Sequence, residues 1–96
     1  MLYDILVSDE VNELVKDLDK KSARIIKDNL KKLNKHPYPG EGKGDKEKIK
    51  WKGKELYRLH IGRSWTAFYS INEEKKEIKV HKVMTIKRAH KEYGDI

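Results

Sequence analysis

One stretch of this chain can form neither a helix nor a central strand, and it divides the sequence into two unlike parts. Residues 34–47 (NKHPYPGEGKGDKE) hold both prolines and three of the six glycines, a composition that favours turns. Before this stretch, apolar residues recur every three or four positions, whereas after it they alternate with polar ones. The sequence therefore predicts a helical part, then one long loop that includes Lys46, and then a part made of strands.

The helical part is expected to begin with a short strand. Residues 2–7 place every second side chain on the same side, which is the period of a strand. Ser8 or Asp9 can then cap a helix. Two apolar stripes at helical spacing follow, made of Val11, Leu14, Val15 and Leu18 and of Ala23, Ile26, Leu30 and Leu33. They predict two helices joined by a short turn near Asp19.

Three or four strands are expected after the loop, over residues 48–51 with a possible extension, 56–61, 65–71 and 77–84. Their short links imply antiparallel pairing. In the last strand, alternation puts Val80 and Met84 on one face and His81 and Val83 on the other. The polar tail, residues 85–96, is either a last helical turn near the sheet or a loose extension.

The predicted fold is therefore α+β, with a helical hairpin on one face of a mainly antiparallel sheet and the other face partly open. A chain of 96 residues suffices for one core, so we expect residues 1–96 to form a single domain. No apolar run approaches the roughly 20 residues needed to cross a bilayer, and the start lacks the features of a secretory signal. These patterns predict a soluble protein of the cytoplasm.

The charge is positive and unevenly distributed along the chain. The net charge is +7; residues 1–34 hold as many acidic as basic side chains, so the whole excess falls in residues 35–96. Such an excess favours contact with nucleic-acid phosphates, although a lysine-rich solvated surface is the plain alternative. There is no cysteine, and the histidines, which are His36, His60, His81 and His90, are too scattered to suggest a metal site. We expect neither a metal nor a cofactor.

Residues 48–63 (KIKWKGKELYRLHIGR) concentrate positive charge on predicted strands. If Leu59 and Ile61 point into the core, Arg58 and His60 must share the open face. The preceding lysines are expected on that face too: Lys48, Lys50 and Lys52. Between them, Trp51 is either a core residue or a platform for a base. Cations and an imidazole on one face suit metal-free RNA cleavage, which needs a base and positive charge around the phosphate.

Two stretches resemble toxins of the RelE/ParE superfamily. Residues 52–71 (KGKELYRLHIGRSWTAFYSI) are similar to the family's central hairpin, and residues 80–93 (VHKVMTIKRAHKEY) to its last strand and basic, tyrosine-ending tail. The resemblance implies a βααβββ microbial RNase-like fold and binding in the ribosomal A site. It also implies cleavage of mRNA through the ribose 2′-hydroxyl and a RelB-like antitoxin as partner.

The resemblance also implies roles for individual residues. His60 corresponds to the base and Arg58 to a phosphate-binding residue. The arginine of the family's tail falls on Lys87 or Arg88, and its terminal tyrosine, which stacks on or orients the nucleotide, on Tyr93. The expected catalytic residues are thus Arg58, His60, Arg88 and Tyr93, and the expected RNA-binding residues are Lys48, Lys50, Lys52, Arg63, Lys87 and His90.

One departure bears on activity. Where the family has an arginine at the start of the return strand, Trp65 is followed by Thr66. Arg63 in the preceding turn is the candidate substitute, and His90 is an alternative acid. Two other functions therefore remain open: a ParE-like inhibitor of DNA gyrase, which keeps the fold without the RNase residues, and a non-catalytic module that binds RNA or an antitoxin.

Overall fold

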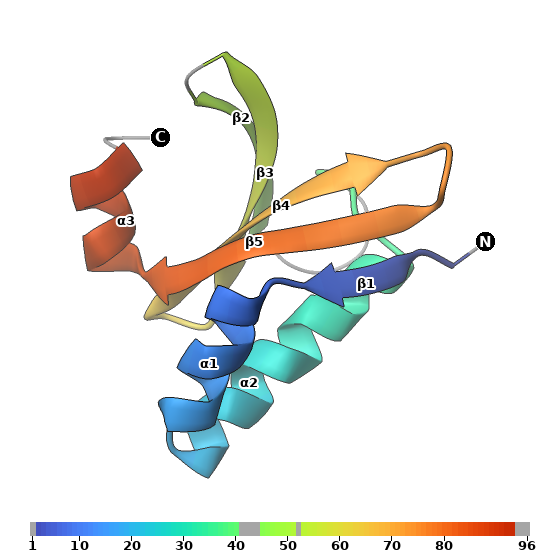
Figure 1. The fold of residues 1–96 in the computed structure, drawn as a ribbon. Coiled ribbons are helices and arrows are strands. Elements are labelled where there is room, and N and C mark those ends of the chain that lie inside the picture. Colours follow the sequence, from blue (N-terminus) through green and yellow to red (C-terminus); the bar gives the residue numbers. More distant parts are fainter. Residues whose placement is uncertain (1, 41–44, 52, 94–96) are drawn as a thin grey trace.

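The computed structural model describes residues 2–40, 45–51 and 53–93, apart from the side chains of Asp45, Trp51 and Tyr93. Figure 1 shows the elements, which are β1 (Asp4–Val7), α1 (Asp9–Asp17), α2 (Lys20–Lys31), a short 3-10 helix η1 (Lys32–Asn34), β2 (Asp45–Trp51), β3 (Lys54–Ile61), β4 (Trp65–Asn72), β5 (Glu77–Thr85) and α3 (Ile86–Tyr93). The expected order of strand, two helices and three or four strands is confirmed, with four strands after the loop, and the tail is helical. No helix in the described ranges is long and apolar enough to span a bilayer.

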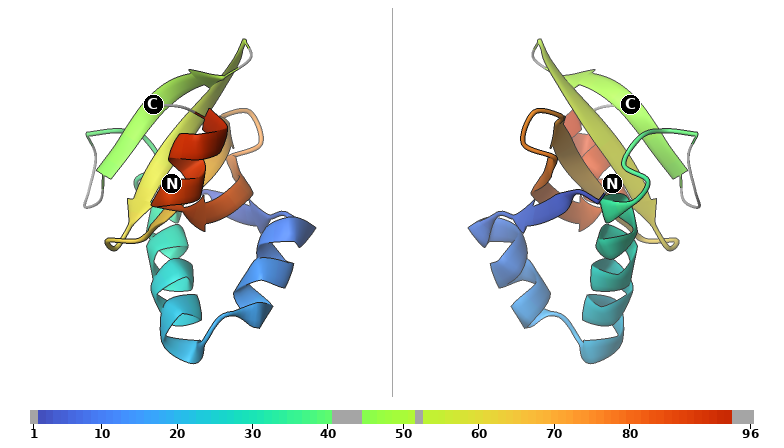
Figure 2. Two further views of the ribbon diagram at one scale, coloured as in Figure 1. Left: turned by 90° about the vertical axis from the view of Figure 1, so that its left-hand side faces the viewer. Right: turned by 90° about the vertical axis from the view of Figure 1, so that its right-hand side faces the viewer.

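The five strands form one sheet in the order β1-β5-β4-β3-β2. Strands β2 to β5 pair antiparallel with their neighbours, as predicted, whereas β1 runs parallel to β5, with Ile5 opposite Ile78. The first strand thus lies beside the last, and the α1–α2 hairpin connects β1 to the rest of the sheet. In both figures this hairpin lies to one side of the sheet and α3 stands apart from it (Figures 1 and 2). The α+β class is confirmed.

Both hairpin helices begin at side-chain caps. The Ser8 hydroxyl accepts a hydrogen bond from the Val11 amide at 3.3 Å, and the Asp19 carboxylate accepts one from the Ser22 amide at 3.2 Å. These bonds satisfy amides that the first turn leaves without partners. The Ser8 hydroxyl also donates to the His81 carbonyl at 2.9 Å, so the cap of α1 is tied to β5.

The main core lies between the hairpin and one face of the sheet. We call this the hairpin face; its buried strand residues are Leu59, Ile61, Ala67, Tyr69, Ile78, Val80 and Val83. The helices contribute Val11, Ile26 and Leu30, all buried. The Tyr69 hydroxyl donates to the Pro37 carbonyl at 2.6 Å. That bond fixes the segment after η1 to the core.

The opposite face is called the α3 face; its strand residues include Leu56, Arg58, His60, Thr66, Phe68, Ser70, Lys82 and Met84. A smaller apolar cluster sits on it, where Ala89 of α3 is buried with Ile49, Phe68 and Met84. The expected partly open face is therefore covered in part by α3. Its remaining polar residues border this cluster.

A β-bulge in β5 changes the predicted assignment of faces. Phe68 pairs with Lys82 and Tyr69 pairs with Val80, so His81 is the extra residue that has no opposite number on β4. The extra residue reverses alternation beyond it. Val83, expected on the face opposite Val80, packs with Val80 in the main core, and Met84 lies on the α3 face. The predicted faces of these two side chains are wrong for this reason.

Strand β2 is longer than predicted and the loop correspondingly shorter. It begins at Asp45 because β3 continues far enough to pair with it, with Asp45 opposite His60 and Lys46 opposite Leu59. Lys46 was expected in the loop but is 8% exposed. Its ammonium group donates to the His36 carbonyl at 2.6 Å, which makes it part of the structure that holds the loop.

Candidate functional site

Arg58 and His60 project from the same face of β3, as their alternation with Leu59 and Ile61 predicts. Leu59 and Ile61 are buried in the main core, so Arg58 and His60 lie on the α3 face. His60 is paired with Thr66 on the neighbouring strand. Residues two apart on a strand are about 7 Å apart, which is close enough for both side chains to act on one phosphodiester.

The guanidinium group of Arg58 already contacts a carboxylate. Arg58 and Glu47 are opposite each other on β3 and β2 and form a close, hydrogen-bonded ion pair. The Arg58 side chain is only 11% exposed, whereas that of Glu47 is 58% exposed. The arginine is thus fixed by its surroundings while its partner faces solvent. A phosphate that approaches Arg58 has to share the guanidinium with Glu47 or displace it.

A pocket of about 220 Å³ opens beside this pair and is lined by Lys46, Glu47, Arg58 and His60. A water molecule in the liquid occupies roughly 30 Å³, so the space admits a phosphate group together with several waters. The structure therefore brings two of the predicted catalytic residues, Arg58 and His60, to one pocket.

Thr66, which stands where the family has an arginine, cannot supply charge to the pocket. It is buried, and its hydroxyl donates to the Leu59 carbonyl at 3.2 Å. The proposed substitute, Arg63, lies exposed in the turn between β3 and β4, next to the His60 end of β3. Its position is compatible with an approach to RNA, but none of the described contacts joins it to the pocket.

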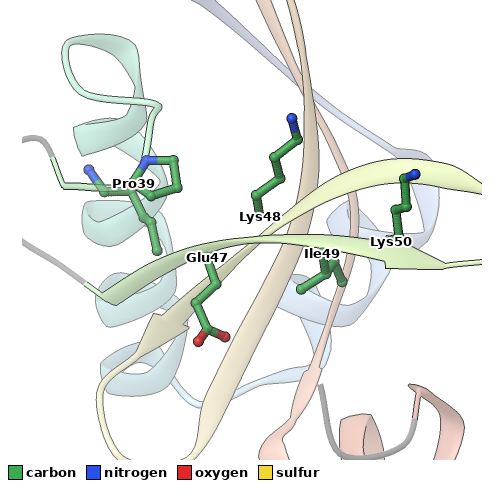
Figure 3. Close-up of a pocket in the computed structure, with 6 residues that line it drawn as sticks. Pro39, Glu47, Lys48, Ile49 and Lys50 are labelled. Carbon is green, nitrogen blue, oxygen red and sulfur yellow. The ribbon is translucent and has the colours of Figure 1, made fainter.

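The lysines of β2 lie on the wrong face for the predicted site. Lys48 pairs with Tyr57 and Lys50 pairs with Glu55, so both belong to the side of the hairpin face. Figure 3 shows them pointing one way from β2 and Glu47 pointing the other. The Lys48 ammonium lies 3.4 Å from the Glu55 carboxylate. The expectation that these lysines share the face of Arg58 is wrong, because the register of β2 directs Glu47, not its lysines, toward the α3 face.

These lysines instead border a second pocket at the free edge of β2. It measures about 600 Å³ and is lined by Pro39, Lys46, Glu47, Lys48, Ile49 and Lys50 (Figure 3). The third predicted lysine, Lys52, lies outside the described residues, as do the side chains of Trp51 and Tyr93.

Helix α3 brings part of the tail to the α3 face. Ala89 is buried against the strands, and the exposed residues around it include Lys87, Arg88 and His90. Arg88 lines a small crevice with Lys82 of β5 and with Glu10 and Leu14 of α1, and it pairs with Glu92 at 3.1 Å. Arg88 therefore lies beside α1 and β5, and no described contact brings Lys87, Arg88 or His90 to the Arg58–His60 pocket.

The sequence analysis put His81 on the face opposite Val80, as the structure does, but did not count it among the candidate site residues. Its Nε2 lies 2.8 Å from the Ser70 hydroxyl. Burial lowers the pKa of His81, and the positive charges of Lys79 and Lys54 lower it further. A lowered pKa favours the neutral imidazole, which can accept a proton. The sequence carried one signal of the bulge next to it: strict alternation would put Lys82 in the core beside Val80.

The α3 face combines imidazole groups with cations. His60 and His81 each bring an imidazole to this face, and the side chains of Arg58 and Lys82 can bind phosphate oxygens. Metal-free RNA cleavage uses groups of these two kinds. Within the described ranges, no three histidine or carboxylate side chains are grouped as a metal site. Positive charge thus reaches this face from β3 and β5.

Comparison with known proteins places this arrangement in context. Neither a protein-family model nor a curated protein sequence matches the chain, but solved structures do. RelE in the RelE–RelB complex of the archaeon Pyrococcus horikoshii OT3 is 30% identical, with a TM-score of 0.74 over 93% of this chain and 100% of that one. The RelBE2 complex of Mycobacterium tuberculosis matches at 11% identity and TM-score 0.70, over 88% and 99% of the two chains.

The RelBE complex of E. coli matches at 17% identity and TM-score 0.57, over 85% of this chain and 94% of that one. At such identities the bacterial matches establish the fold alone, which is the sheet and helices described above. The archaeal protein adds sequence identity along nearly the whole of both chains. On that ground this chain belongs to the RelE family of toxins.

Proposed function

We propose that this protein is a toxin that cuts mRNA on the ribosome and is silenced by a RelB-like antitoxin in the cytoplasm. The carrying observation is that Arg58 and His60 line one pocket on the α3 face. Family membership supports the proposal, since the matched toxins of Pyrococcus horikoshii, Mycobacterium tuberculosis and E. coli were each solved with an antitoxin. In this proposal residues 1–96 form a single toxin domain.

In the proposed reaction, His60 removes the proton of a ribose 2′-hydroxyl. The 2′-oxygen attacks the adjacent phosphorus, the bond from phosphorus to the 5′-oxygen breaks, and a 2′,3′-cyclic phosphate and a 5′-hydroxyl end are formed. Arg58 stabilises the negative charge on the phosphate oxygens as it grows. Arg88 provides positive charge near the departing oxygen, which takes its proton from water or an imidazolium.

The structure supports some of the predicted RNA-binding residues more than others. Arg88 lies beside Lys82 in a crevice that α1 also lines, so its part in the reaction rests on the family resemblance, as does that of Tyr93 on the same helix. Arg63 lies at the His60 end of β3 and Lys87 and His90 lie on α3, so RNA contacts by these residues stay part of the proposal. Lys48 and Lys50 are not included, because they lie on the opposite face from Arg58.

The test is an in vitro translation reaction in which new 5′ ends on the mRNA are mapped by primer extension. Wild-type protein should produce ends at ribosome-positioned codons. His60→Gln should slow cleavage roughly a hundredfold or more, the usual range for a general base, and Arg58→Ala should also abolish most of it. Lys75→Gln, in the exposed turn after β4, is the control. Intact mRNA with the wild-type protein would reject the proposal.

Two observations favour a second candidate. The position of the family's arginine is held by Thr66, which is buried and bonded to backbone, and Glu47 neutralises Arg58. A ParE-like inhibitor of DNA gyrase or a non-catalytic RNA- or antitoxin-binding module needs no such charge. Inhibited supercoiling by purified gyrase, with mRNA left intact, would identify the first; RNA or antitoxin binding without either activity would identify the second.

A further inference from the structure

We propose that α2 carries a second nucleic-acid surface, a docking site for the phosphate backbone of double-helical RNA. Four positive side chains make this surface, which we call the α2 row: Lys20, Arg24, Lys27 and Lys31. It goes beyond the proposed cleavage site, because binding there requires no chemistry and involves none of the residues of the α3 face.

The charges of the hairpin are segregated by helix. Although residues 1–34 are neutral as a whole, α1 contains four carboxylates and one lysine, whereas α2 contains five basic side chains and only one carboxylate, that of Asp28. Surfaces that serve solubility usually intersperse both signs. Here the two signs are largely separated between the two helices.

The dipole of α2 acts on the row with both signs. The first turn of α2 has no acidic residue and begins with Lys20 and Lys21, whose charges are unfavourable at that end by a few tenths of a kcal/mol each. The carboxylate of the cap, Asp19, offsets part of this cost, and Lys31 in the last turn is favourable. The helix dipole therefore neither favours nor opposes the α2 row as a whole.

The α2 row has the geometry of a backbone contact. Its members follow one another by four, three and four residues, so they lie along one side of the helix over about 16 Å. Together with Ala23 and Asp28 they line a shallow depression of about 380 Å³. Duplex nucleic acid carries a phosphate about every 3.4 Å of axis on each strand. A row of this length therefore meets several phosphates at once.

The members of the row are exposed, and none takes part in the ion pairs or side-chain hydrogen bonds among described residues. Their charges are thus available to a ligand. The depression offers a protein partner little to bury, because Ala23 is its one apolar lining residue. Protein interfaces are depleted of lysine and centred on larger apolar anchors, whereas nucleic-acid interfaces are polar and positive. This composition favours RNA.

The α2 row cannot bind the same segment of RNA that lies at Arg58. Helix α2 packs through Ile26 and Leu30 on the hairpin face of the sheet, and Arg58 projects from the other face. An RNA bound along α2 is therefore a different segment from one being cut at the α3 face. The two surfaces together would hold the protein against a structured RNA while a single strand occupies the pocket.

The experiment measures binding of the full chain to a fluorescent RNA duplex of about 16 base pairs by anisotropy, as a function of salt. The test variant is Arg24→Gln, Lys27→Gln, Lys31→Gln. The matched control, Lys16→Gln, Lys21→Gln, Lys75→Gln, loses the same net charge and includes a lysine of α2 outside the row. Glutamine preserves helix propensity, and circular dichroism melts confirm that both variants fold.

We expect the row variant to bind at least about tenfold more weakly at low salt and to lower the slope of log K against log salt by 2 to 3, since each lost phosphate contact removes about 0.9. The control should change affinity by less than about threefold. Equal weakening in both variants would mean that only net charge matters and would overturn the proposal. So would a row variant that keeps duplex affinity but loses affinity for the cognate antitoxin, which would make the row a protein surface.

The binding measurement is independent of cleavage. Arg58→Ala in the same titration should retain the salt slope of the wild type, because Arg58 is on the other face. If the protein cuts no mRNA yet the row variant loses duplex binding, the cleavage proposal fails and the docking proposal stands. If Arg58→Ala loses duplex binding and the row variant does not, the duplex binds at the α3 face and the docking proposal fails.

Discussion

At the residue scale, Arg58 is held by Glu47 before any RNA arrives. The Arg58 side chain is mostly covered, whereas the Glu47 side chain is exposed. Glu47 keeps the guanidinium oriented, but it also competes with phosphate for the same N–H donors. In the proposed function, Glu47 would therefore fix the arginine and weaken the binding of RNA in the pocket.

Replacing Glu47 by Gln should tighten RNA binding at the α3 face. The amide keeps a hydrogen-bond acceptor for Arg58 but removes the negative charge. Because Glu47 faces solvent, we count its competition with phosphate as about 1 kcal/mol or less and expect up to about a fivefold lower Kd. Binding is measured with a single-stranded RNA that carries 2′-O-methyl ribose throughout, which cannot be cut. Glu55→Gln removes the same charge beside Lys48 on the other face and should have a smaller effect; equal gains would contradict the competition.

His81 should make folding stability depend on pH. Because burial and neighbouring lysines lower the pKa of His81, the unfolded chain binds a proton there at a pH where the folded chain does not. Its contribution to stability is complete above the usual pKa of 6.5 and is lost as pH falls from that value toward the lowered one. His81→Gln can keep the bond to Ser70 and should flatten this fall. Urea unfolding at pH 7.5 and pH 5 measures it, with His90→Gln as control; parallel losses in all three proteins would contradict the assignment.

At the element scale, the sequence predicted those features that depend on local periodicity. Alternation placed Arg58 and His60 on one face of β3, because Leu59 and Ile61 need the core. The prediction from alternation failed at β2. Lysine and apolar residues alternate there too, but the face of each side chain is set by the pairing of β2 with β3, which begins at Asp45. It failed at β5 because one extra residue, His81, shifts every later side chain. Register and bulges arise from contacts between strands, which a single sequence does not contain.

Ser8 links α1 to β5 through its side-chain hydroxyl. It caps α1 through the Val11 amide and donates to the His81 carbonyl at the bulge of β5. Ser8→Ala removes both bonds, and loss of a cap typically costs about 1 to 2 kcal/mol. We expect a fall of that size in the free energy of unfolding measured in urea. Ser64→Ala, in the exposed turn after β3, should change it little, and an equal loss there would show that the cap is unimportant.

At the scale of the whole molecule, the two proposed RNA surfaces lie on opposite sides of one sheet. Arg58 belongs to the α3 face and the α2 row to a helix packed on the hairpin face. Groups that are far apart and share no partner contribute additively to binding. The sheet between them therefore acts as a rigid spacer, and the distance between the two surfaces is fixed by the fold.

That separation predicts additivity on ribosomes. Combining Arg58→Ala with the three substitutions of the α2 row should weaken binding to programmed ribosomes by the sum of the separate free-energy changes, within about 0.5 kcal/mol. Sedimentation or filter binding measures each affinity. A combined loss well below the sum would mean that both surfaces contact one shared site, contrary to their placement on the two faces.

The parallel pairing of β1 with β5 has a consequence for synthesis of the chain. Residue 4 meets residue 77, so the first strand remains without its neighbour until β5 has been made. Pairings so distant in sequence also form late and slowly in folding. The β2–β3 pair, which carries the Arg58–His60 pocket, needs neither β1 nor β5. That pocket can therefore form on a growing chain before the sheet is completed at β1.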